Sequence, residues 1–402
     1  MMAAGQAAEA SPAGYGPTIA LVAGEASGDI LGAGLIRALR ERYPSARFVG
    51  VGGPLMRLEG MQIWWDASEL AVMGLTEVIR HLPRLLRLRR QLRQRLLALR
   101  PDLFVGIDAP DFNLGLERSL KSARVPTAHY VSPSIWAWRR GRAKRMGESA
   151  DRVLCLFPME PPVYAEYGVD ARFIGHPLAD HFPLEPQRES SRRQLGLPAD
   201  ARILALLPGS RLGEIQRIGA DFIATAGRLQ HEDERLQVLA PMATPACRAA
   251  FEALLAASPG PPRIQLLDQQ SQLALQAADA VLLASGTAAL EALLARTPMV
   301  VAYRISALTY WIVRSFRMLK VDRFSLPNAL ADEPIVPECM QADCNPTRLH
   351  AELYPLLHVD SAADAQTRRF GEIHRRLRLD ASRSAAAVLS ELIEDRPADA
   401  VP

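Results

Sequence analysis

Residues 281–304, VLLASGTAALEALLARTPMVVAYR, restrict the fold of this chain more than any other stretch. Their pattern predicts a short buried strand, a tight turn at Ser285, Gly286 and Thr287, a helix, and a second strand. A turn of this kind presents unpaired backbone N–H groups and the positive end of a helix dipole, which suits a phosphate group. Glu291 lies one helical turn after Thr287, on the face where a ribose hydroxyl would lie. An ordinary αβ unit with a capping Ser or Thr is the alternative.

A second strand-to-helix turn occurs at residues 203–211, ILALLPGSR. Gly209 and Ser210 close an apolar strand there, and Arg211 follows directly. The guanidinium group of arginine is planar, permanently charged and shaped to match phosphate oxygens. Two turns of this kind in one half of a chain can hold a diphosphate from two sides. The alternative for Arg211 is a surface charge without a ligand.

The composition is that of a globular protein with two domains. With 402 residues, of which 49% are hydrophobic and 23% charged, the chain can bury two cores. A net charge of +3 is too small to argue for nucleic acid as a partner. The four cysteines lack the paired spacing of a zinc site, which predicts a reducing compartment and no metal. No uncharged apolar run reaches the roughly 18 residues needed to span a bilayer, so we expect a cytosolic protein with at most peripheral membrane contact.

The N-terminal half begins with the same alternation. Residues 18–23, TIALVA, predict a strand, and the Gly-rich turn after it carries Glu25 and Ser27. The turn lacks the G-x-G-x-x-G pattern of dinucleotide sites. Carboxylate and hydroxyl groups at the end of a strand suit sugar hydroxyls better than a pyrophosphate. The alternative is that side chains of this turn cap the following helix.

A catalytic carboxylate is predicted after the strand at residues 101–107, PDLFVGI. Asp108 follows this strand directly, and ligands of open α/β sheets bind at the C-terminal ends of parallel strands. A carboxylate held near a hydroxyl can remove its proton as the oxygen attacks, so Asp108 is the first candidate for a general base. Asp111 could equally cap the next helix, and a structural turn aspartate is the alternative for Asp108. His176 is a second candidate base, against a structural turn histidine.

A basic amphipathic helix is predicted at residues 81–100, HLPRLLRLRRQLRQRLLALR. Leucines repeat there at helical spacing, and residues 80–100 contain eight arginines and no acid. Such a helix can lie on anionic lipid or attract a phosphorylated lipid, whereas the alternative is a crossover helix with a solvated arginine face. An apolar loop at 70–75 extends the predicted surface. The two tryptophans of a second loop could form the floor of an acyl or sugar site, or they could pack against the wall of the crevice. The residues predicted to face lipid are Val72, Met73, Arg84, Arg87, Trp136 and Trp138.

The order of the predicted elements divides the chain into two α/β halves. Each half alternates strands and helices, which is the pattern of a parallel sheet covered by helices. The polar, proline-containing stretch between the halves favours a linker, and the last helices are expected to cross back to the first half. The predicted parts are a disordered tail at 1–16, an N-terminal domain at 17–184, a linker at 185–200, a C-terminal domain at 201–345 and C-terminal helices at 346–402.

Seven segments along nearly the whole chain resemble the lipid-A-disaccharide synthase family and occur in the family's order. Seven motifs in register are a specific signal, whereas GTAALE alone would indicate only some nucleotide-sugar enzyme. The segments are GEASGD at 24–29, GIDAPDFN at 106–113, YVSPSIWAW at 130–138, FIGHPLAD at 173–180, LLPGSR at 206–211, ASGTAALE at 284–291 and SLPN at 325–328.

The resemblance implies an α/β fold of two Rossmann-like domains facing a cleft, the glycosyltransferase B-type fold, with the nucleotide held mainly by the C-terminal domain. It implies transfer of 2,3-diacylglucosamine from UDP-2,3-diacylglucosamine to the 6-hydroxyl of 2,3-diacylglucosamine 1-phosphate. A β-1,6-linked disaccharide and UDP result, with inversion. No D-x-D motif is present, which agrees with an enzyme that needs no metal or cofactor. The positions that match the family are Glu25, Ser27, Asp108, Arg211, Glu291 and Asn328.

These implications give a hypothesis for the mechanism. Asp108 accepts the proton of the acceptor hydroxyl, while Arg211 and the two turns stabilise the charge that builds on the leaving UDP. Glu291 would hold the ribose, and Asn328 a phosphate or the uracil side. The rival interpretations are a UDP-sugar epimerase and a non-catalytic nucleotide-binding protein of the same fold. The resemblance places such an enzyme peripherally at the cytoplasmic face of the inner membrane, with a homodimer left open and no nucleic acid as a partner.

Overall fold

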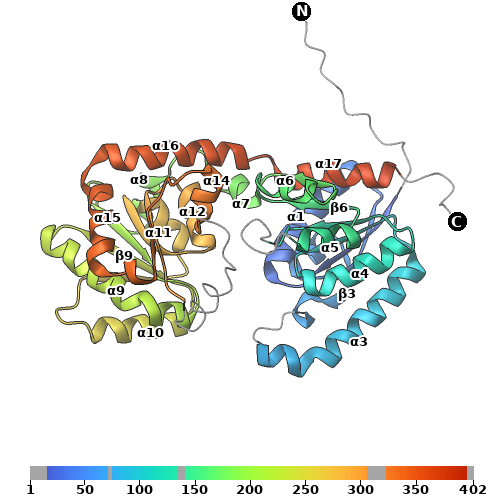
Figure 1. Cartoon of the computed structure of the whole chain (residues 1–402), viewed down its shortest axis with the longest axis horizontal. Coiled ribbons are helices and arrows are strands. Elements are labelled where there is room, and N and C mark those ends of the chain that lie inside the picture. The colour runs from blue at the N-terminus through green and yellow to red at the C-terminus, as the bar shows by residue number, and fades with distance from the viewer. Residues whose placement is uncertain (1–15, 71–74, 134–140, 306–322, 396–402) are drawn as a thin grey trace, which may run out of the picture. The chain divides into compact units, whose positions relative to one another are not determined.

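The computed structural model of the chain describes four segments, which are residues 16–70, 75–133, 141–305 and 323–395. The chain forms two compact units (Figure 1). Unit 1 contains residues 1–177 and 379–402, and unit 2 contains residues 178–378. Each unit has its own parallel sheet, as the alternation of strands and helices predicts.

Unit 1 is built on a parallel sheet of seven strands within the described residues, in the order β3-β2-β1-β4-β5-β6-β7. Its strands are β1 (Thr18–Ala23), β2 (Arg47–Gly52), β3 (Gln62–Asp66), β4 (Leu103–Ile107), β5 (Thr127–Tyr130), β6 (Arg152–Cys155) and β7 (Ala171–Phe173). Its helices are α1 (Ala26–Arg42), α2 (Pro54–Leu58), α3 (Leu75–Leu99), α4 (Pro110–Ser122), α5 (Arg142–Ser149), α6 (Glu160–Ala165), α17 (Ala381–Glu394) and the short 3₁₀ helix η1 (Ala67–Glu69). The strand order reverses between β1 and β4, and ligands of such sheets bind at the C-terminal ends of strands at this switch.

The strand β1 shows how the sequence builds the core of unit 1. Its residues from Ile19 onward are fully buried, because helices cover both faces of the sheet. Ile19 and Leu21 pack with residues of α1 and α17, while Ala20 and Val22 pack with residues of α3 and α4. The continuous apolar run that predicts this strand is therefore a consequence of its burial on two sides.

Unit 2 is built on a parallel sheet of six strands within the described residues, in the order β10-β9-β8-β11-β12-β13. Its strands are β8 (Ile203–Leu207), β9 (Gln237–Met242), β10 (Ile264–Asp268), β11 (Ala280–Ala284), β12 (Met299–Tyr303) and β13 (Glu338–Met340). Its helices are α7 (Pro177–His181) at the boundary with unit 1, α8 (Arg188–Gln194), α9 (Leu212–Glu232), α10 (Pro245–Ala256), α11 (Ser271–Ala277), α12 (Thr287–Leu294), α14 (Leu326–Ala331), α15 (Pro346–His358), α16 (Asp360–Leu377) and the 3₁₀ helix η2 (Gln341–Asp343). The strand order reverses between β8 and β11, the two strands that the predicted phosphate turns follow.

Of the predicted C-terminal helices, α17 returns to unit 1, whereas α15 and α16 pack on unit 2. Figure 1 shows α17 in red on a unit that is otherwise blue to green. The Tyr43 hydroxyl donates to Glu394 Oε1 at 2.8 Å, and Arg152 pairs with Glu391 at 2.8 Å. The expected crossing back is thus confirmed for the last helix.

The predicted linker at 185–200 is a folded part of unit 2, because it contains α8. Arg192 of this helix is buried, and its guanidinium group donates to the carbonyl oxygens of Ala199 and Ala277. It also pairs with Asp279 at 2.9 Å. A buried arginine with this many partners ties the stretch to the sheet through the start of β11.

Gly50 is a position where alanine should strongly destabilise unit 1. Its φ of +136° is one that L-residues rarely adopt, and a Cβ there would lie 2.1 Å from the Leu21 carbonyl oxygen on the neighbouring strand. Because that obstacle is sheet backbone, Gly50→Ala should lower the free energy of unfolding by about 3 kcal/mol or more, measured by urea denaturation. Gly168→Ala is the control, since Gly168 has a φ of +66° and nothing within 4 Å. A loss no larger than the control's, about 1 kcal/mol, would contradict the clash.

Candidate active site

A pocket in unit 2 lies at the C-terminal ends of β8, β9, β11 and β12, the edge of the sheet at which the sequence predicts a nucleotide. Its volume is about 400 Å³. Because β8 and β11 are hydrogen-bonded neighbours, the two turns that follow them meet in one place. The predicted donor-binding residues that line this pocket are Gly209, Ser210, Arg211, Ser285, Gly286, Thr287 and Glu291.

The turn after β11 leaves the N-terminus of α12 uncapped. Gly286 precedes the helix with a φ of 155° and a ψ of −156°, a conformation restricted almost entirely to glycine. Because glycine has no side chain, Gly286 makes no side-chain hydrogen bond to the start of the helix. Thr287 of the first turn lines the pocket. The backbone N–H groups and the positive end of the helix dipole thus lie at the pocket, where the sequence predicts a phosphate site. Glu291 is half-buried in the pocket wall, and burial raises the pKa of its carboxyl group.

The turn after β8 differs from the prediction, because its backbone already holds a carboxylate. Glu214, in the first turn of α9, accepts hydrogen bonds from the N–H groups of Ser210 at 3.0 Å and Arg211 at 3.3 Å. Gly209 is required beside it, since a Cβ there would lie 2.3 Å from Glu214 Oε2. The group that this turn leaves for a ligand is the guanidinium of Arg211, whose side chain is 84% exposed and lies 3.8 Å from Glu214 Oε1.

Asn328, the remaining predicted donor-binding residue, does not line the pocket. It is 3% exposed, and its Nδ2 donates to the Val336 carbonyl oxygen at 3.0 Å and to Glu338 Oε1 at 2.7 Å. Its Oδ1 accepts from the N–H groups of Ile335 at 2.8 Å and Val336 at 2.9 Å. These bonds use the whole hydrogen-bonding capacity of the amide. The structure therefore gives Asn328 a structural role, and its contact with a phosphate or the uracil stays a prediction.

In unit 1, Asp108 stands at the end of β4 in a strained turn. Asp108 and Ala109 both have left-handed φ values, 52° and 44°, which are unfavourable for residues other than glycine. The Asp108 side chain is half-buried, and its Oδ1 accepts a hydrogen bond from the Ala109 N–H group at 2.8 Å. Its Oδ2 has no partner in the part of the chain that the structure describes. One oxygen of this carboxylate is therefore available to accept a proton.

Glu25 and Ser27 follow β1, the strand that neighbours β4. Both residues are exposed, and the Glu25 side chain makes no capping hydrogen bond although Glu25 is the N-cap residue of α1. A Cβ at Gly24 would lie 3.1 Å from the Cβ of Ala109, so the turns after β1 and β4 are in contact. The structure thus places Glu25 and Ser27 next to the turn that carries Asp108.

Buried polar side chains at the ends of β5 and β6 were missed by the sequence interpretation. The Ser132 hydroxyl, close after β5, lies 2.9 Å from the Tyr164 hydroxyl. Glu160 is buried at the start of α6, where burial raises the pKa of its carboxyl group to about 7. Burial lowers the pKa of His176 to about 4, which makes this histidine a weaker base than the sequence interpretation assumes. Nothing in the spacing of these residues signals that they are buried together.

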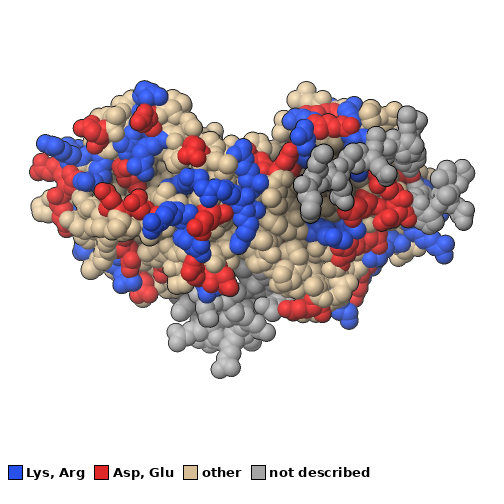
Figure 2. All heavy atoms as spheres, turned by 90° about the horizontal axis from the view of Figure 1, so that it is seen from above, with Lys and Arg blue, Asp and Glu red and all other residues tan. Residues whose placement is uncertain are grey.

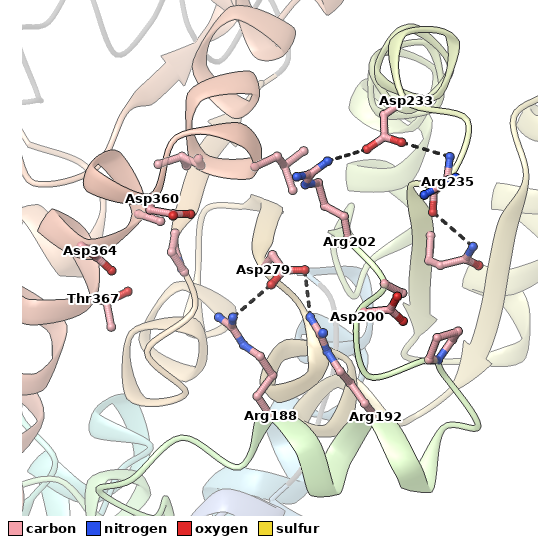
Figure 3. A pocket seen from close by; sticks show the side chains of 17 residues that line it. Arg188, Arg192, Asp200, Arg202, Asp233, Arg235, Asp279, Asp360, Asp364 and Thr367 are labelled. Carbon is pink, nitrogen blue, oxygen red and sulfur yellow. Dashed lines mark hydrogen bonds and ion pairs between the residues drawn. The ribbon is translucent and has the colours of Figure 1, made fainter.

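A larger cavity of about 890 Å³ lies at the N-terminal ends of the unit 2 strands, the edge opposite the predicted nucleotide pocket. Figure 3 shows that three of its arginines pair with carboxylates of the cavity: Arg188 and Arg192 pair with Asp279, and Arg202 pairs with Asp233. These arginines are occupied by internal ion pairs rather than presented to an anion. The smaller pocket therefore remains the predicted nucleotide site, because ligands of open α/β sheets bind at the C-terminal ends of the strands.

The predicted lipid-facing residues are only partly within the described chain. Those that lie outside the described residues are Val72, Met73, Trp136 and Trp138. Arg84 and Arg87 are exposed on α3, and Arg84 pairs with Glu69 at 3.0 Å. Leu82 and Leu86 are 46% and 45% exposed on the same part of the helix. The first described turns of α3 thus present leucine and arginine side chains together to the solvent.

Two features are absent from the described residues. These residues include no helix that is both long enough and apolar enough to cross a bilayer. They also contain no cluster of three or more His, Cys, Asp or Glu side chains that could bind a metal ion. On the face shown in Figure 2, basic and acidic side chains are interspersed, in keeping with the small net charge of +3.

Comparison with solved structures identifies the fold class. The chain is similar to a UDP-GlcNAc 2-epimerase from Neisseria meningitidis bound to UDP-GlcNAc, with a TM-score of 0.63 and 12% identity over 93% of this chain and 100% of that one. It is also similar to the glycotransferase of kitacinnamycin, with a TM-score of 0.59 and 17% identity over 94% of this chain and 99% of that one. With two Rossmann-like units and a pocket at the strand ends of unit 2, the chain has the glycosyltransferase B-type fold.

The chain belongs to the lipid-A-disaccharide synthase family, because residues 19–392 match the family model described as lipid-A-disaccharide synthetase. It is 56% identical over 382 residues to the lipid-A-disaccharide synthase of Xanthomonas campestris pv. campestris (strain 8004), covering 94% of this chain and 87% of that protein. It is 51% identical over 381 residues to that of Xylella fastidiosa (strain M12), covering 94% and 99%. The chain is therefore a disaccharide-forming glycosyltransferase of lipid A biosynthesis, and the epimerase and non-catalytic interpretations are set aside.

Proposed function

We propose that the chain transfers 2,3-diacylglucosamine from UDP-2,3-diacylglucosamine to the 6-hydroxyl of 2,3-diacylglucosamine 1-phosphate, with inversion and release of UDP. Membership of the family supports the disaccharide product. The observation that carries the choice of a nucleotide-activated donor is that residues predicted from two separate sequence stretches line one pocket at the ends of β8 and β11.

The donor is held by three groups of unit 2 in this proposal. The N-terminus of α12 and the turn at Ser285 and Gly286 bind the diphosphate through backbone N–H groups, aided by the helix dipole. The guanidinium of Arg211 binds the same diphosphate through charge-assisted hydrogen bonds. The half-buried carboxylate of Glu291 accepts hydrogen bonds from the ribose hydroxyls. This arrangement stabilises the negative charge that develops on UDP as its bond to the sugar breaks.

The acceptor is activated by unit 1. Asp108 Oδ2, which has no partner among the described residues, takes the proton of the acceptor hydroxyl as that oxygen forms its bond to the anomeric carbon. Glu25 and Ser27, on the adjoining turn, bind hydroxyl groups of the sugar. The electron pair of the broken bond leaves with UDP, so the reaction needs no oxidant or reductant and inverts the anomeric centre in one displacement.

The experiment that tests this function measures UDP release from UDP-2,3-diacylglucosamine with and without the 1-phosphate acceptor, in the absence of added metal. We expect release that depends on the acceptor, in equal amount to a disaccharide product detected by mass spectrometry. Release without acceptor at the same rate, or conversion of the donor into an isomer, would contradict the proposal.

We also propose that α3 attaches the enzyme peripherally to the cytoplasmic face of the inner membrane. Leu82 and Leu86 are exposed there beside Arg84 and Arg87, so one surface combines side chains that enter the lipid interface with side chains that bind anionic headgroups. The substrates carry acyl chains in this proposal, and an enzyme bound at the membrane surface reaches them where they reside.

Removing two arginines of α3 should weaken membrane binding without affecting the chemistry. Arg87 and Arg90 are exposed and have no acidic partner in the described chain, so their replacement by Gln disturbs no ion pair. At about 1 kcal/mol per cation near an anionic surface, the double variant should bind anionic vesicles roughly 30-fold more weakly in a sedimentation assay. Turnover of detergent-dispersed substrate should change by less than about twofold.

The matched control replaces Arg368 and Arg375, two exposed arginines of α16 on unit 2, by Gln. It removes the same charge from another surface and should leave vesicle binding unchanged. Equal losses of binding in the two double variants, or equal losses of binding and detergent-phase turnover in the α3 variant, would count against attachment through α3.

A further inference from the structure

The turn that carries Asp108 has a backbone conformation that needs support. Two successive residues other than glycine, Asp108 and Ala109, adopt φ values of 52° and 44°. Side chains with a Cβ disfavour this left-handed region, and such conformations persist only where surrounding contacts impose them. The Asp108 N–H group donates to the Tyr130 carbonyl oxygen of β5 at 2.8 Å, and further contacts come from α4, the helix that begins directly after the turn.

Asn113 supplies the side-chain contact from α4. Its side chain is fully buried, and Nδ2 donates to the carbonyl oxygens of Asp108 at 2.8 Å, Val22 at 3.2 Å and Ile107 at 3.4 Å. Val22 belongs to β1 and Ile107 is the last residue of β4, so one amide group joins the ends of two neighbouring strands to the start of the turn. Asn113 Oδ1 has no partner within the described residues. The donor half of the amide is therefore the half that the structure uses.

The packing below Asn113 keeps α4 close to the strands. A Cβ at Gly106 of β4 would lie 2.9 Å from the Asn113 Cβ and 2.2 Å from Glu117 Oε1, so the helix approaches the strand where there is no side chain. Glu117 lies one helical turn after Asn113, and its Oε1 is 2.7 Å from Nδ1 of His129 on β5, with both side chains fully buried. The Asn113 amide thus belongs to a helix that packs closely on β4 and contacts β5 through Glu117.

We infer that Asn113 is a positioning residue, which holds the Asp108 turn in its left-handed conformation and thereby aims the carboxylate of Asp108. The inference rests on the proposal that Asp108 is the general base. Asn113 itself is buried and touches no substrate. Loss of its amide lets the turn relax, which displaces the carboxylate, and a displacement of about 1 Å at a reacting group can lower a rate by about 10²-fold.

The test compares Asn113→Ala with Thr127→Val in the full chain. Thr127 is also fully buried in unit 1, but its hydroxyl donates to Asp151 at 3.0 Å at the opposite end of β5. Both variants lose a buried hydrogen-bonding group and should lower the melting temperature. Only Asn113→Ala should lower kcat, by about tenfold or more. Its dissociation constant for UDP should stay within about twofold of the original, because the nucleotide pocket belongs to unit 2.

A double-mutant cycle separates positioning from a general loss of structure. In the Asp108→Asn background there is no base to aim, so adding Asn113→Ala should cause little further loss of kcat. Additive losses, or a kcat of Asn113→Ala equal to that of Thr127→Val, would overturn the positioning role while leaving Asp108 as the base. A nearly normal kcat for Asp108→Asn alone would overturn both. If Asn113→Ala does not fold, Asn113→Ser keeps one donor and should show the same pattern at smaller amplitude.

Discussion

Asp108→Asn is expected to lower kcat by about 10²-fold or more while leaving folding and UDP binding unchanged. The amide has the shape of the carboxylate, and its oxygen can still accept the hydrogen bond from the Ala109 N–H group that Asp108 Oδ1 accepts at 2.8 Å. Asparagine also tolerates the left-handed φ of 52° found at this position. What it lacks is the basicity to take a proton from the acceptor hydroxyl. The measurement is steady-state disaccharide formation, with UDP affinity and melting temperature recorded on the same preparation.

The matched control for this variant is Asp111→Asn. Asp111 belongs to the same motif and is exposed in the first turn of α4, where its negative charge interacts favourably with the helix dipole. Its replacement removes one negative charge three residues from Asp108 and should change kcat by less than about twofold. Nearly normal turnover of Asp108→Asn, or a comparable fall in both variants, would remove Asp108 from the proposed mechanism.

The sequence could predict that the donor-binding residues lie together, because each turn that carries them is recognised from a local sequence pattern. At 281–304 an apolar run, a turn rich in glycine and serine, and a run of helix formers together predict a strand, a tight turn and a helix. A similar strand and turn are predicted at 203–211, with a helix after them. Parallel strands then place all such turns at one edge of the sheet. Ser285 and Gly209 line one pocket for this reason, although 75 residues separate them in the sequence.

The hydrogen-bond partners of each polar group could not be predicted, because the fold brings those partners together from distant parts of the sequence. Glu214 is an ordinary residue of a predicted helix, yet it occupies the backbone N–H groups of Ser210 and Arg211. Asn328 belongs to a family motif, yet its amide is used entirely inside unit 2. A motif names the residue type at a position, and the neighbours in space decide whether that residue binds a ligand or the protein itself.

The unit on which each C-terminal helix packs also could not be predicted from the sequence. The pattern at 346–402 predicts amphipathic helices but not which unit each one covers, because an apolar stripe fits any complementary surface. The structure assigns α16 to unit 2 and α17 to unit 1, where Glu394 meets Tyr43 across 351 positions of the chain. The homodimer that the sequence leaves open stays a prediction.

Arg211→Ala is expected to lower kcat/KM for the donor by about 10²-fold or more, because two charge-assisted hydrogen bonds to the diphosphate are each worth about 1.5–3 kcal/mol. The side chain is 84% exposed and lies 3.8 Å from Glu214 Oε1, so its loss should leave the melting temperature unchanged. The guanidinium is directed at the diphosphate in our proposal, so the variant should weaken binding of UDP more than binding of UMP. Calorimetric titration with both nucleotides measures this difference.

Two further variants decide whether the charge or the shape of Arg211 matters. Arg211→Lys keeps a cation but not the planar fork, and it should recover only part of the lost activity. Arg248→Ala is the control for removing a surface arginine of unit 2, since Arg248 pairs with Glu252 and Asp268 at 2.9 Å and does not line the pocket. If UDP and UMP lost affinity equally in Arg211→Ala, the diphosphate would not be its partner. The carboxylate of Glu214 already accepts hydrogen bonds from the backbone N–H groups of the same turn. Binding of the diphosphate would therefore depend on the N-terminus of α12 alone.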